Sequence, residues 1–297
     1  MRRGVWSALC LGAGLLRAGE APGVVDRVTP LFNGQNLEGF HTWLVDTRRE
    51  DPRGVFSVTN GMIRVSGEGL GYLGTLQSYQ DYHLIVEFKW GTRNWTWGDR
   101  VGKARDSGVF LHSTGPDGNS VDGQGAFKAA IECNLFQGAT GDLLLIRGHD
   151  RDGRLIAPRI RAEVAEELDP DGHFTWKPGG QVQTREHWGR LNWFGKDPDW
   201  KDVLNFRGPR DPEHAYGAWN RLECFCEKDR IRIVLNGVVV NEAFDVRPSS
   251  GPILLQCEGS EIYFRRVELH PLEISSTKPA AEKSGGASGV NRDCGPP

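Results

Sequence analysis

The sequence predicts an all-β protein, built as a sandwich of two antiparallel sheets. Short runs in which apolar and polar residues alternate recur along most of the 297-residue chain, and a period of two is typical of strands with one buried face. The 39 glycines and 16 prolines suit many turns between short strands better than a bundle of helices. Asn236 and Gly237 stand between two alternating runs, which is the strongest short signal for a β-hairpin because both residues tolerate positive φ.

Strands are expected at intervals along the whole chain. The clearest covers residues 82–90, where the apolar positions end on Trp90, a predicted core residue. Helical periodicity is indicated only over the short segment 161–168. Further strands are predicted at residues 54–58, 61–65, 107–112, 129–135, 142–147, 221–226, 230–235, 252–258 and 261–269.

A long segment interrupts this pattern inside a single predicted domain of residues 27–273. Residues 148–217 are rich in Gly, Pro, Asp, Arg and Trp and have weak periodicity. The segment is too long for an ordinary connection between strands, and loops of that size are usually functional or disordered. Its seven Phe and Trp residues argue for order, so we expect an insertion that folds over one face of the sandwich.

The two ends of the chain differ from the domain between them. Two arginines precede an apolar stretch over residues 5–16, and small residues follow at Ala18, Gly19 and Ala21. This order is typical of a secretory signal over residues 1–22, which predicts export to the periplasm or the cell exterior. A buried N-terminal helix is the alternative. Residues 274–297 are small and polar and are predicted to form a disordered tail.

Charge and cysteine content exclude several classes of function. The net charge of −3, from 36 basic and 39 acidic residues, gives no electrostatic case for binding nucleic acid or an anionic membrane. No stretch after the signal is long and apolar enough to span a bilayer. Five cysteines follow the signal without metal-type spacing, and we interpret the first four as core residues, although export would permit a disulfide. They are Cys133, Cys224, Cys226, Cys257 and Cys294.

Five segments, in order along the chain, carry a resemblance to one family. They are LFNGQNLEGF at 31–40, DSGVFLH at 106–112, IECNL at 131–135, WNRL and LNGV at 219–222 and 235–238, and GPILLQCEGS at 251–260. Together they resemble the 3-keto-disaccharide hydrolase family, also described as 3-keto-glucoside 1,2-lyases and 3-keto-2-hydroxy-glucal hydratases. The resemblance covers residues 30–272 apart from the insertion.

The resemblance implies a concanavalin A-like jelly roll that acts on sugars oxidised to a ketone at C3. It also implies export, in line with the signal sequence. This chain departs from the common pattern at two places. Asp106 stands where many members have Asn, and Cys257-Glu258 stands where some members have Asp-His.

One predicted strand invites comparison with ordinary glycosidases. In retaining glucanases on this sandwich the corresponding strand carries E-x-D-x-x-E, which supplies the nucleophile and the acid/base. Here the strand has Glu132, Asn134 and Gln137 at those positions. A single carboxylate disfavours double-displacement chemistry on this strand.

A 3-keto sugar does not need two flanking carboxylates. Its ketone acidifies the hydrogen on C2, so one base can form an enediolate that expels the C1 substituent, and water can then add. The reaction needs a base near C2, a group that stabilises the oxyanion, and an acid for the leaving group. A divalent metal ion could also stabilise the enediolate.

Alternation with a period of two brings the candidate residues to one sheet face. If the apolar faces are buried, the polar faces converge on an exposed concave sheet. The catalytic candidates are Glu132, His112, Asp106 and Glu258, with Glu132 the favoured base or metal ligand. The substrate-binding candidates are Lys128, Asn134, Gln256, Trp95 and Trp97. Each could instead have a structural role, in a salt bridge, a strand end or the core.

Two functions of different classes therefore follow from the sequence. The first is an exported enzyme that cleaves the glycosidic bonds of 3-keto-glucosides or 3-keto-disaccharides, with a small carbohydrate as its only predicted partner. The second is a non-catalytic, lectin-like carbohydrate-binding module, because one fold can host both. Convergence of Glu132, Asp106 and Glu258 on one face would favour catalysis, since a binding module needs aromatic platforms but no such group.

Overall fold

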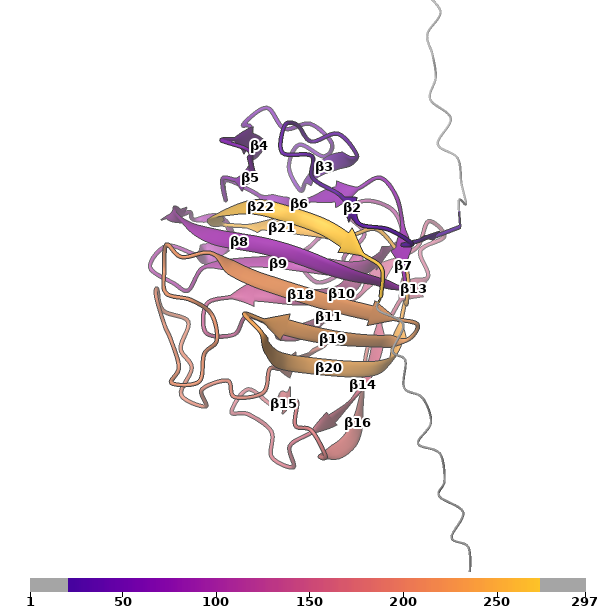
Figure 1. The fold of residues 1–297 in the computed structure, drawn as a ribbon, viewed down its shortest axis with the longest axis vertical. Coiled ribbons are helices and arrows are strands. Elements are labelled where there is room, and N and C mark those ends of the chain that lie inside the picture. Colours follow the sequence, from indigo (N-terminus) through magenta and orange to yellow (C-terminus); the bar gives the residue numbers. More distant parts are fainter. Residues whose placement is uncertain (1–20, 273–297) are drawn as a thin grey trace, which may run out of the picture.

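A computed structural model describes residues 21–272 of the chain (Figure 1). It confirms the all-β prediction: the regular elements of this range are strands, apart from one short 3-10 turn, η1 (Trp97–Asp99). The predicted signal at 1–22, except its last two residues, and the predicted tail at 274–297 lie outside the described residues. Within residues 21–272, no helix has the length and apolar character needed to cross a membrane.

The first large sheet has eight strands. All neighbouring strands in it are antiparallel except the pair β15 and β17. Their spatial order is β15 (Phe174–Thr175), β17 (Gly189–Asn192), β11 (Leu143–Ile146), β10 (Ala129–Phe136), β9 (Asp106–Thr114), β21 (Leu254–Glu258), β6 (Leu70–Thr75) and β3 (Phe40–Leu44).

The second large sheet has ten strands and is antiparallel throughout. Its main path is β16 (Gln181–Glu186), β14 (Arg159–Val164), β20 (Val238–Arg247), β19 (Arg230–Leu235), β18 (Asn220–Glu227), β8 (Tyr82–Asn94), β22 (Ser260–His270), β5 (Met62–Val65) and β4 (Phe56–Thr59), and β2 (Thr29–Pro30) pairs with β22.

The two sheets stack as layers of a jelly-roll sandwich. In Figure 1 the strands β22, β8, β18, β19 and β20 lie in front of β21, β9, β10 and β11. One large hydrophobic core lies between the layers, and it takes alternate residues from both sheets. Val109 and Leu111 of β9 are in this core, as are Leu222 and Cys224 of β18. Their chain neighbours therefore face outward, because successive strand residues point to opposite faces.

The predicted strands are confirmed, with boundaries that shift by a few residues. The run at 82–90 forms the first part of β8, and Trp90 is 3% exposed in the core. The indole N–H of Trp90 donates a hydrogen bond to Glu213 at 2.6 Å. The four cysteines within residues 21–272 are buried and free, as expected for core residues, whereas Cys294 lies outside that range.

The predicted hairpin is confirmed at its turn. Asn236 has φ of 48° and Gly237 has φ of 82°, and Leu235 pairs with Val238 across the turn. A Cβ at Gly237 would meet nothing within 4 Å. The need for glycine here is therefore the backbone conformation and not the available space.

The helix indicated for residues 161–168 is wrong. The segment begins within β14, where Ile160, Ala162 and Val164 are buried and their neighbours are not. This burial has a period of two, so pairing with β16 and β20 outweighs the weak helical pattern.

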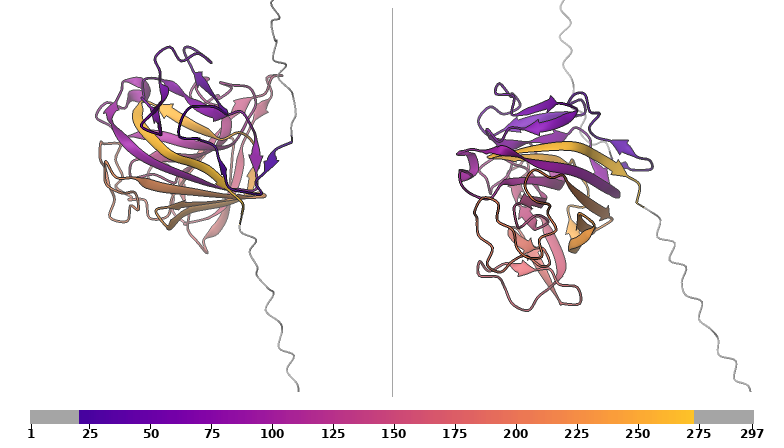
Figure 2. Two further views of the ribbon diagram at one scale, coloured as in Figure 1. Left: turned by 45° about the horizontal axis from the view of Figure 1, so that its top comes forward. Right: turned by 60° about the vertical axis from the view of Figure 1, so that its left-hand side comes forward.

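The segment 148–217 extends both sheets at one edge. Its strands β14 and β16 continue the ten-stranded sheet, and β15 and β17 continue the eight-stranded sheet. β14, β15 and β16 lie at the end of the sandwich opposite β3, β4 and β5 in Figure 1, and Figure 2 shows the same end from two further sides. The sequence suggested an insertion over one face, and the structure instead divides the segment between both sheets and the loops that join them.

Two short strand pairs complete the described fold. β1 (Gly23–Val24) pairs in parallel with β7 (Tyr79–Gln80) near the start of the domain. β12 (Gly148–His149) pairs with β13 (Leu155–Ile156) at the beginning of the 148–217 segment.

Candidate functional site

Three carboxyl side chains converge on the outer face of the eight-stranded sheet. Asp106 begins β9, Glu132 lies in β10, and Glu258 ends β21. The alternate residues of these strands face the core, which turns the carboxyl groups away from it. We call Asp106, Glu132 and Glu258 the carboxyl cluster. The convergence that the sequence predicted for these three residues is present.

A glycine makes room for the cluster. Gly108 of β9 pairs with Asn134 of β10. A Cβ at Gly108 would stand 2.5 Å from Oε1 of Glu132 and 2.9 Å from Oε1 of Gln256. Because Gly108 has no side chain, the Glu132 carboxyl lies across β9, beside Gln256. This role of Gly108 depends on the neighbouring strands and is not visible in the sequence.

Two amide side chains hold the cluster and keep unused acceptors. Nδ2 of Asn134 donates to Oε1 of Glu132 at 2.8 Å, and Nε2 of Gln256 donates to Oε2 of Glu258 at 2.6 Å. Among the described residues, no group donates to the buried oxygens Asn134 Oδ1, Gln256 Oε1 and Asp106 Oδ1. Buried acceptors are normally satisfied, so these three oxygens mark a place where a ligand rich in hydroxyl groups would supply the donors.

Burial gives the carboxyl cluster unusual acidity. Burial, and then repulsion from Asp106, raises the pKa of Glu132 to about 8, although the hydrogen bond from Asn134 opposes the rise. Burial and the nearby Glu132 raise the pKa of Glu258 to about 7. Burial and Glu258 raise the pKa of Asp106 well above its usual value. The cluster therefore holds protons near neutral pH, as acid/base sites commonly do.

Two arginines flank the cluster. Nη1 of Arg100 lies 3.7 Å from Oδ2 of Asp106, and Nη1 of Arg190 donates to Oδ2 of Asp142 at 2.7 Å. Their guanidinium groups lie 5.5 and 5.9 Å from the ring of Phe136. Both arginines lower the pKa of Asp106 and of Glu258, against the larger effect of burial.

Sequence reasoning missed both arginines. Arg100 stands in the Gly- and Arg-rich loop that also carries Trp95 and Trp97, which is a weak signal. Arg190 comes from β17 of the 148–217 segment, and no sequence pattern links that strand to the cluster.

The predicted tryptophans lie in a turn beside Glu258. A Cβ at Gly98 would stand 3.1 Å from Cγ of Glu258, so the turn around η1 packs on the end of β21. The indole of Trp95 donates to the carbonyl of Ser66 at 2.8 Å, which ties it to the protein frame. The ring of Trp97 lies 5.5 Å from the guanidinium of Arg53.

The structure corrects the predicted placement of His112. A bulge interrupts the pairing of β9 with β10 here, and His112 has φ of 55°. Its ring packs edge-on against Tyr82 of the core at 5.8 Å, and its Nδ1 lies 3.1 Å from the carbonyl oxygen of Pro248. Burial lowers the pKa of His112 to about 4. Alternation with a period of two does not continue through a bulge, so His112 does not join the cluster.

Lys128 belongs to a second polar group on the same sheet. Its Nζ lies 3.8 Å from Oδ1 of Asp117, which also accepts from the Tyr72 hydroxyl at 2.9 Å and lies 3.1 Å from Nε2 of His41. Burial lowers the pKa of Lys128, and Asp117 opposes that effect. Tyr72 of β6 pairs with Gln256 of the adjacent strand β21, so this group lies beside the carboxyl cluster and not within it.

The described residues form no ready-made metal centre. Within residues 21–272, no group of three or more His, Cys, Asp or Glu side chains is arranged to hold a metal ion. The amide nitrogens of Asn134 and Gln256 donate hydrogen bonds to Glu132 and Glu258. We therefore derive no step that involves a metal ion.

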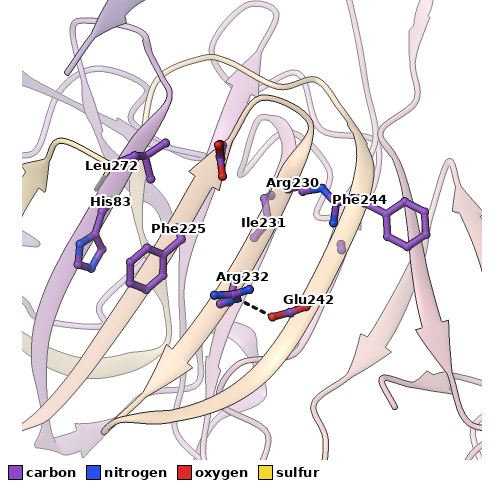
Figure 3. Close-up of a pocket in the computed structure, with 10 residues that line it drawn as sticks. His83, Phe225, Arg230, Ile231, Arg232, Glu242, Phe244 and Leu272 are labelled. Atoms are coloured by element: carbon purple, nitrogen blue, oxygen red, sulfur yellow. Dashed lines mark hydrogen bonds and ion pairs between the residues drawn. The ribbon is translucent and has the colours of Figure 1, made fainter. Parts of the chain in front are cut away.

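A cavity on the ten-stranded sheet contains none of the three residues of the carboxyl cluster. It has a volume of about 410 Å³ and lies on the outer face of the ten-stranded sheet (Figure 3). His83 and Phe225 stack there with ring centroids 3.9 Å apart, and Arg232 pairs with Glu242. Its charged side chains thus include a matched ion pair, and none of the residues that line it belongs to the carboxyl cluster.

The fold and site agree with a family match. Residues 27–270 match the family described as the 3-keto-alpha-glucoside-1,2-lyase-like domain, and the chain belongs to this family. The resemblance seen in the sequence motifs is confirmed. The comparison with curated proteins gives no match.

Solved structures show distant likenesses to this chain. A candidate glycosyl hydrolase from Parabacteroides distasonis is 15% identical, with 83% of this chain and 94% of that chain covered and a TM-score of 0.47. A carbohydrate-binding module from Bacillus subtilis is 13% identical, with 78% and 95% covered and a TM-score of 0.42. A β-glucanase from Bacillus licheniformis is 10% identical, with 82% and 97% covered and a TM-score of 0.41. Similarity at this level does not identify an activity.

Proposed function

We propose that this chain is an enzyme that cleaves the glycosidic bonds of 3-keto-glucosides and 3-keto-disaccharides. Its family supports a carbohydrate-active domain. The observation that carries the proposal is the carboxyl cluster, in which buried groups retain protons near neutral pH beside three acceptor oxygens without donors. A binding module would need the acceptors, but not a set of carboxyl groups tuned for proton transfer.

The chemistry follows from the ketone of the substrate. The C3 carbonyl acidifies the hydrogen on C2, and a base removes that proton to give an enediolate. The enediolate expels the substituent on C1, which takes a proton from an acid, and a double bond forms between C1 and C2. Water then adds to C1 and a proton returns to C2. The net reaction is hydrolysis of the glycosidic bond.

We assign the two proton-transfer roles to Glu132 and Glu258 as a pair. Burial raises both pKa values, to about 8 for Glu132 and about 7 for Glu258, so the pair retains a proton near neutral pH. One carboxylate can then act as the base at C2 while the protonated partner supplies the acid for the leaving group. As in the sequence-based hypothesis, Glu132 is kept as one of these two groups. The two groups repel each other, so they titrate as a coupled pair.

The surrounding side chains suit substrate binding. The unused oxygens of Asn134, Gln256 and Asp106 would accept hydrogen bonds from sugar hydroxyl groups. Arg100 and Arg190 supply positive charge near the cluster, where it would stabilise the oxyanion that develops at C3.

Three of the predicted substrate-binding residues lie outside the carboxyl cluster. We place Lys128 at the edge of the substrate site, through its contact with Asp117. Trp97 is a candidate platform for a sugar ring, whereas the hydrogen bond from Trp95 to Ser66 supports a structural role for Trp95.

One comparison tests the function. Purified protein is incubated with a 3-keto-glucoside and, separately, with its unoxidised parent glucoside, each with and without a chelator. We expect cleavage of the keto sugar alone, at a rate that the chelator does not change. If both sugars bind and neither is cleaved, even with divalent metals supplied, the protein is a lectin-like module. If the parent is cleaved equally well, the enediolate chemistry is wrong.

Export remains a separate proposal that rests on residues 1–22. We propose that the chain is carried to the periplasm or the cell exterior, where it meets its carbohydrate substrate. Cell fractionation of the full chain and of a chain without residues 1–22 tests this. Equal distribution of the two forms between compartments would contradict a signal sequence.

A further inference from the structure

We propose that a cavity built by the 148–217 segment binds the leaving-group sugar of the substrate. This inference rests on the proposed function and assigns a second subsite to it. The cavity has a volume of about 440 Å³, which lies within the range of small-ligand sites. Every residue that lines it falls between Ala165 and Trp200, so the segment alone forms this subsite.

The cavity opens on the same sheet face as the carboxyl cluster. Glu132 of β10 pairs with Leu144 of β11, which pairs with Arg190 of β17. Arg190 is therefore two strand spacings from Glu132, or about 10 Å. Asn192, which lines the cavity, follows Arg190 by two residues and shares its face, because Leu191 between them packs in the core. A ligand that extends along this face from the cluster would reach the cavity with its second ring.

An aromatic ring joins the cavity to the cluster. Trp200 lines the cavity, and its ring packs against Phe136 at 4.9 Å. Phe136 pairs directly with Asp106 of the cluster. The indole N–H of Trp200 donates to the carbonyl of Gln137 at 2.9 Å, which fixes the orientation of the ring. A fixed, half-exposed indole is a suitable surface for the apolar face of a sugar ring.

Hydrogen bonds within the protein fix the polar side chains that line the cavity. Nζ of Lys196 donates to Oδ1 of Asn192 at 2.7 Å and to Oδ2 of Asp142 at 3.2 Å. Nδ2 of Asn192 donates to Oδ2 of Asp169 at 2.7 Å. These contacts set the positions of an ammonium, an amide and a carboxylate around the cavity, which reduces the entropy lost when a polyol binds.

The charges of the lining select the class of leaving group. Four carboxylates line the cavity, against the single ammonium of Lys196; they belong to Glu167, Asp169, Asp171 and Asp197. A negatively charged ring such as a uronic acid would be repelled. The site therefore excludes acidic sugars, and we infer that 3-keto-disaccharides whose second ring carries no negative charge are the preferred substrates.

A cavity-filling variant tests the subsite. Thr175 lines the cavity, and its neighbour Phe174 packs against the core, so the Thr175 side chain faces outward toward Asn192, its partner in β17. The variant is Thr175→Trp. The control is Val182→Trp, at an exposed position of β16 that does not line the cavity. Both variants add the same ring to the same segment.

The readout is a ratio of specificities. We measure kcat/KM for a neutral 3-keto-disaccharide and for a methyl 3-keto-glucoside, which has no second ring. In Thr175→Trp the ratio of the first to the second should fall by about tenfold or more, the usual effect of a lost pocket contact. In Val182→Trp the ratio should not change. An unchanged ratio in Thr175→Trp would overturn the subsite.

Inhibition by free glucose is a second test of the subsite. Free glucose, the product from a glucose disaccharide, should inhibit wild-type turnover of the methyl glycoside, and Thr175→Trp should weaken that inhibition by about tenfold. If Thr175→Trp fails to fold, absence of glucose inhibition in the wild type overturns the subsite. If the wild type turns over neither keto sugar, the proposed function fails, and calorimetric titration of glucose into the wild type, Thr175→Trp and the control Val182→Trp still tests the cavity; equal glucose binding by the wild type and Thr175→Trp would overturn the subsite.

Discussion

The carboxyl side chains on the outer face of the ten-stranded sheet have different partners from Glu132 and Glu258 on the eight-stranded sheet. On the ten-stranded sheet, Arg221 donates to Glu223 at 3.0 Å and Arg265 donates to Glu87 at 2.6 Å. The hydrogen bond from Arg221 lowers the pKa of Glu223, although burial opposes it. On the eight-stranded sheet, Glu132 and Glu258 are buried with amide partners and without a cation in hydrogen-bond contact, and their pKa values rise.

This difference separates charges that stabilise the fold from charges that are available for chemistry. A carboxylate paired with an arginine has a role in the fold and is already satisfied. A buried carboxyl group without such a partner lowers stability when it ionises. A fold that keeps Glu132 and Glu258 together, with a glycine that makes room for Glu132, retains them for a purpose other than stability.

The largest expected effect is the loss of turnover when Glu132 of the carboxyl cluster is replaced. Glu132→Gln keeps the shape and hydrogen bonding of the side chain but removes its proton-transfer group, so turnover of a 3-keto-glucoside should fall by roughly 100-fold or more. The matched control is Glu242→Gln on the ten-stranded sheet, which should keep wild-type turnover. Circular dichroism checks that both variants fold. Wild-type turnover in Glu132→Gln would make Glu132 structural.

The second prediction uses the dependence of stability on pH. The folded pKa of Glu132, about 8, is raised above the ordinary value of 4.5. Stability from its neutral form is complete below pH 4.5 and is lost as the pH rises toward 8, because only the unfolded chain releases the proton over this window. Glu132→Gln should therefore be more stable than the wild type at pH 8, by on the order of a few kcal/mol, with little difference at pH 4.

Glu223 should show the opposite sign in the same experiment. The pKa of Glu223 is lowered in the folded protein. The stability that its ionised form contributes is therefore present above the unfolded pKa and is lost as the pH falls through the folded pKa. Glu223→Gln should be slightly less stable than the wild type at pH 8. Denaturant titrations at several pH values measure both variants. Parallel pH profiles for the two variants would remove the contrast between the faces.

The third prediction concerns the glycine beneath the cluster. A Cβ at Gly108 would approach Oε1 of Glu132 to 2.5 Å, so Gly108→Ala should displace the Glu132 carboxyl. We expect kcat to fall by about tenfold, because a misplaced catalytic group loses much of its effect. Gly23→Ala, in β1, is the control, since Gly23 has no positive φ and a Cβ there would come no closer than 3.8 Å to a neighbouring atom. Equal kcat for Gly108→Ala and the wild type would show that the carboxyl position is not critical.

The smallest expected effect lies in the hairpin of the ten-stranded sheet. Gly237 has φ of 82°, which a β-branched residue resists. Gly237→Val should lower the free energy of unfolding by on the order of 1 kcal/mol, without changing kcat at temperatures where the variant is folded. An unchanged melting temperature would count against the strain at this turn.

Much of the fold could be predicted, because alternation is a local property. The run from Tyr82 to Trp90 shows which residues are buried without knowledge of the partner strands. The same reasoning brought Asp106, Glu132 and Glu258 to one face. It failed for His112, because a bulge and a positive φ turn that residue into the core, and neither feature is visible as a break in the alternation.

The rest of the site depends on which strands are neighbours. Gly108 matters because it pairs with Asn134 and lies between β10 and β21. Arg190 reaches the cluster because β17, from a segment that looked like a loop, pairs with β11. Cross-strand order arises from contacts between distant parts of the chain, so periodicity within one strand does not contain it.

The central claim is that cleavage proceeds through removal of the proton on C2, and deuterium labelling tests it most directly. A 3-keto-glucoside is cleaved by the wild-type protein in D₂O, and the 3-keto-glucose product is examined by mass spectrometry and NMR. Elimination followed by hydration returns a proton from solvent to C2, so we predict one deuterium at C2 of each product molecule, at early times and above the level in unreacted substrate. Cleavage that leaves the original hydrogen on C2 would contradict the account.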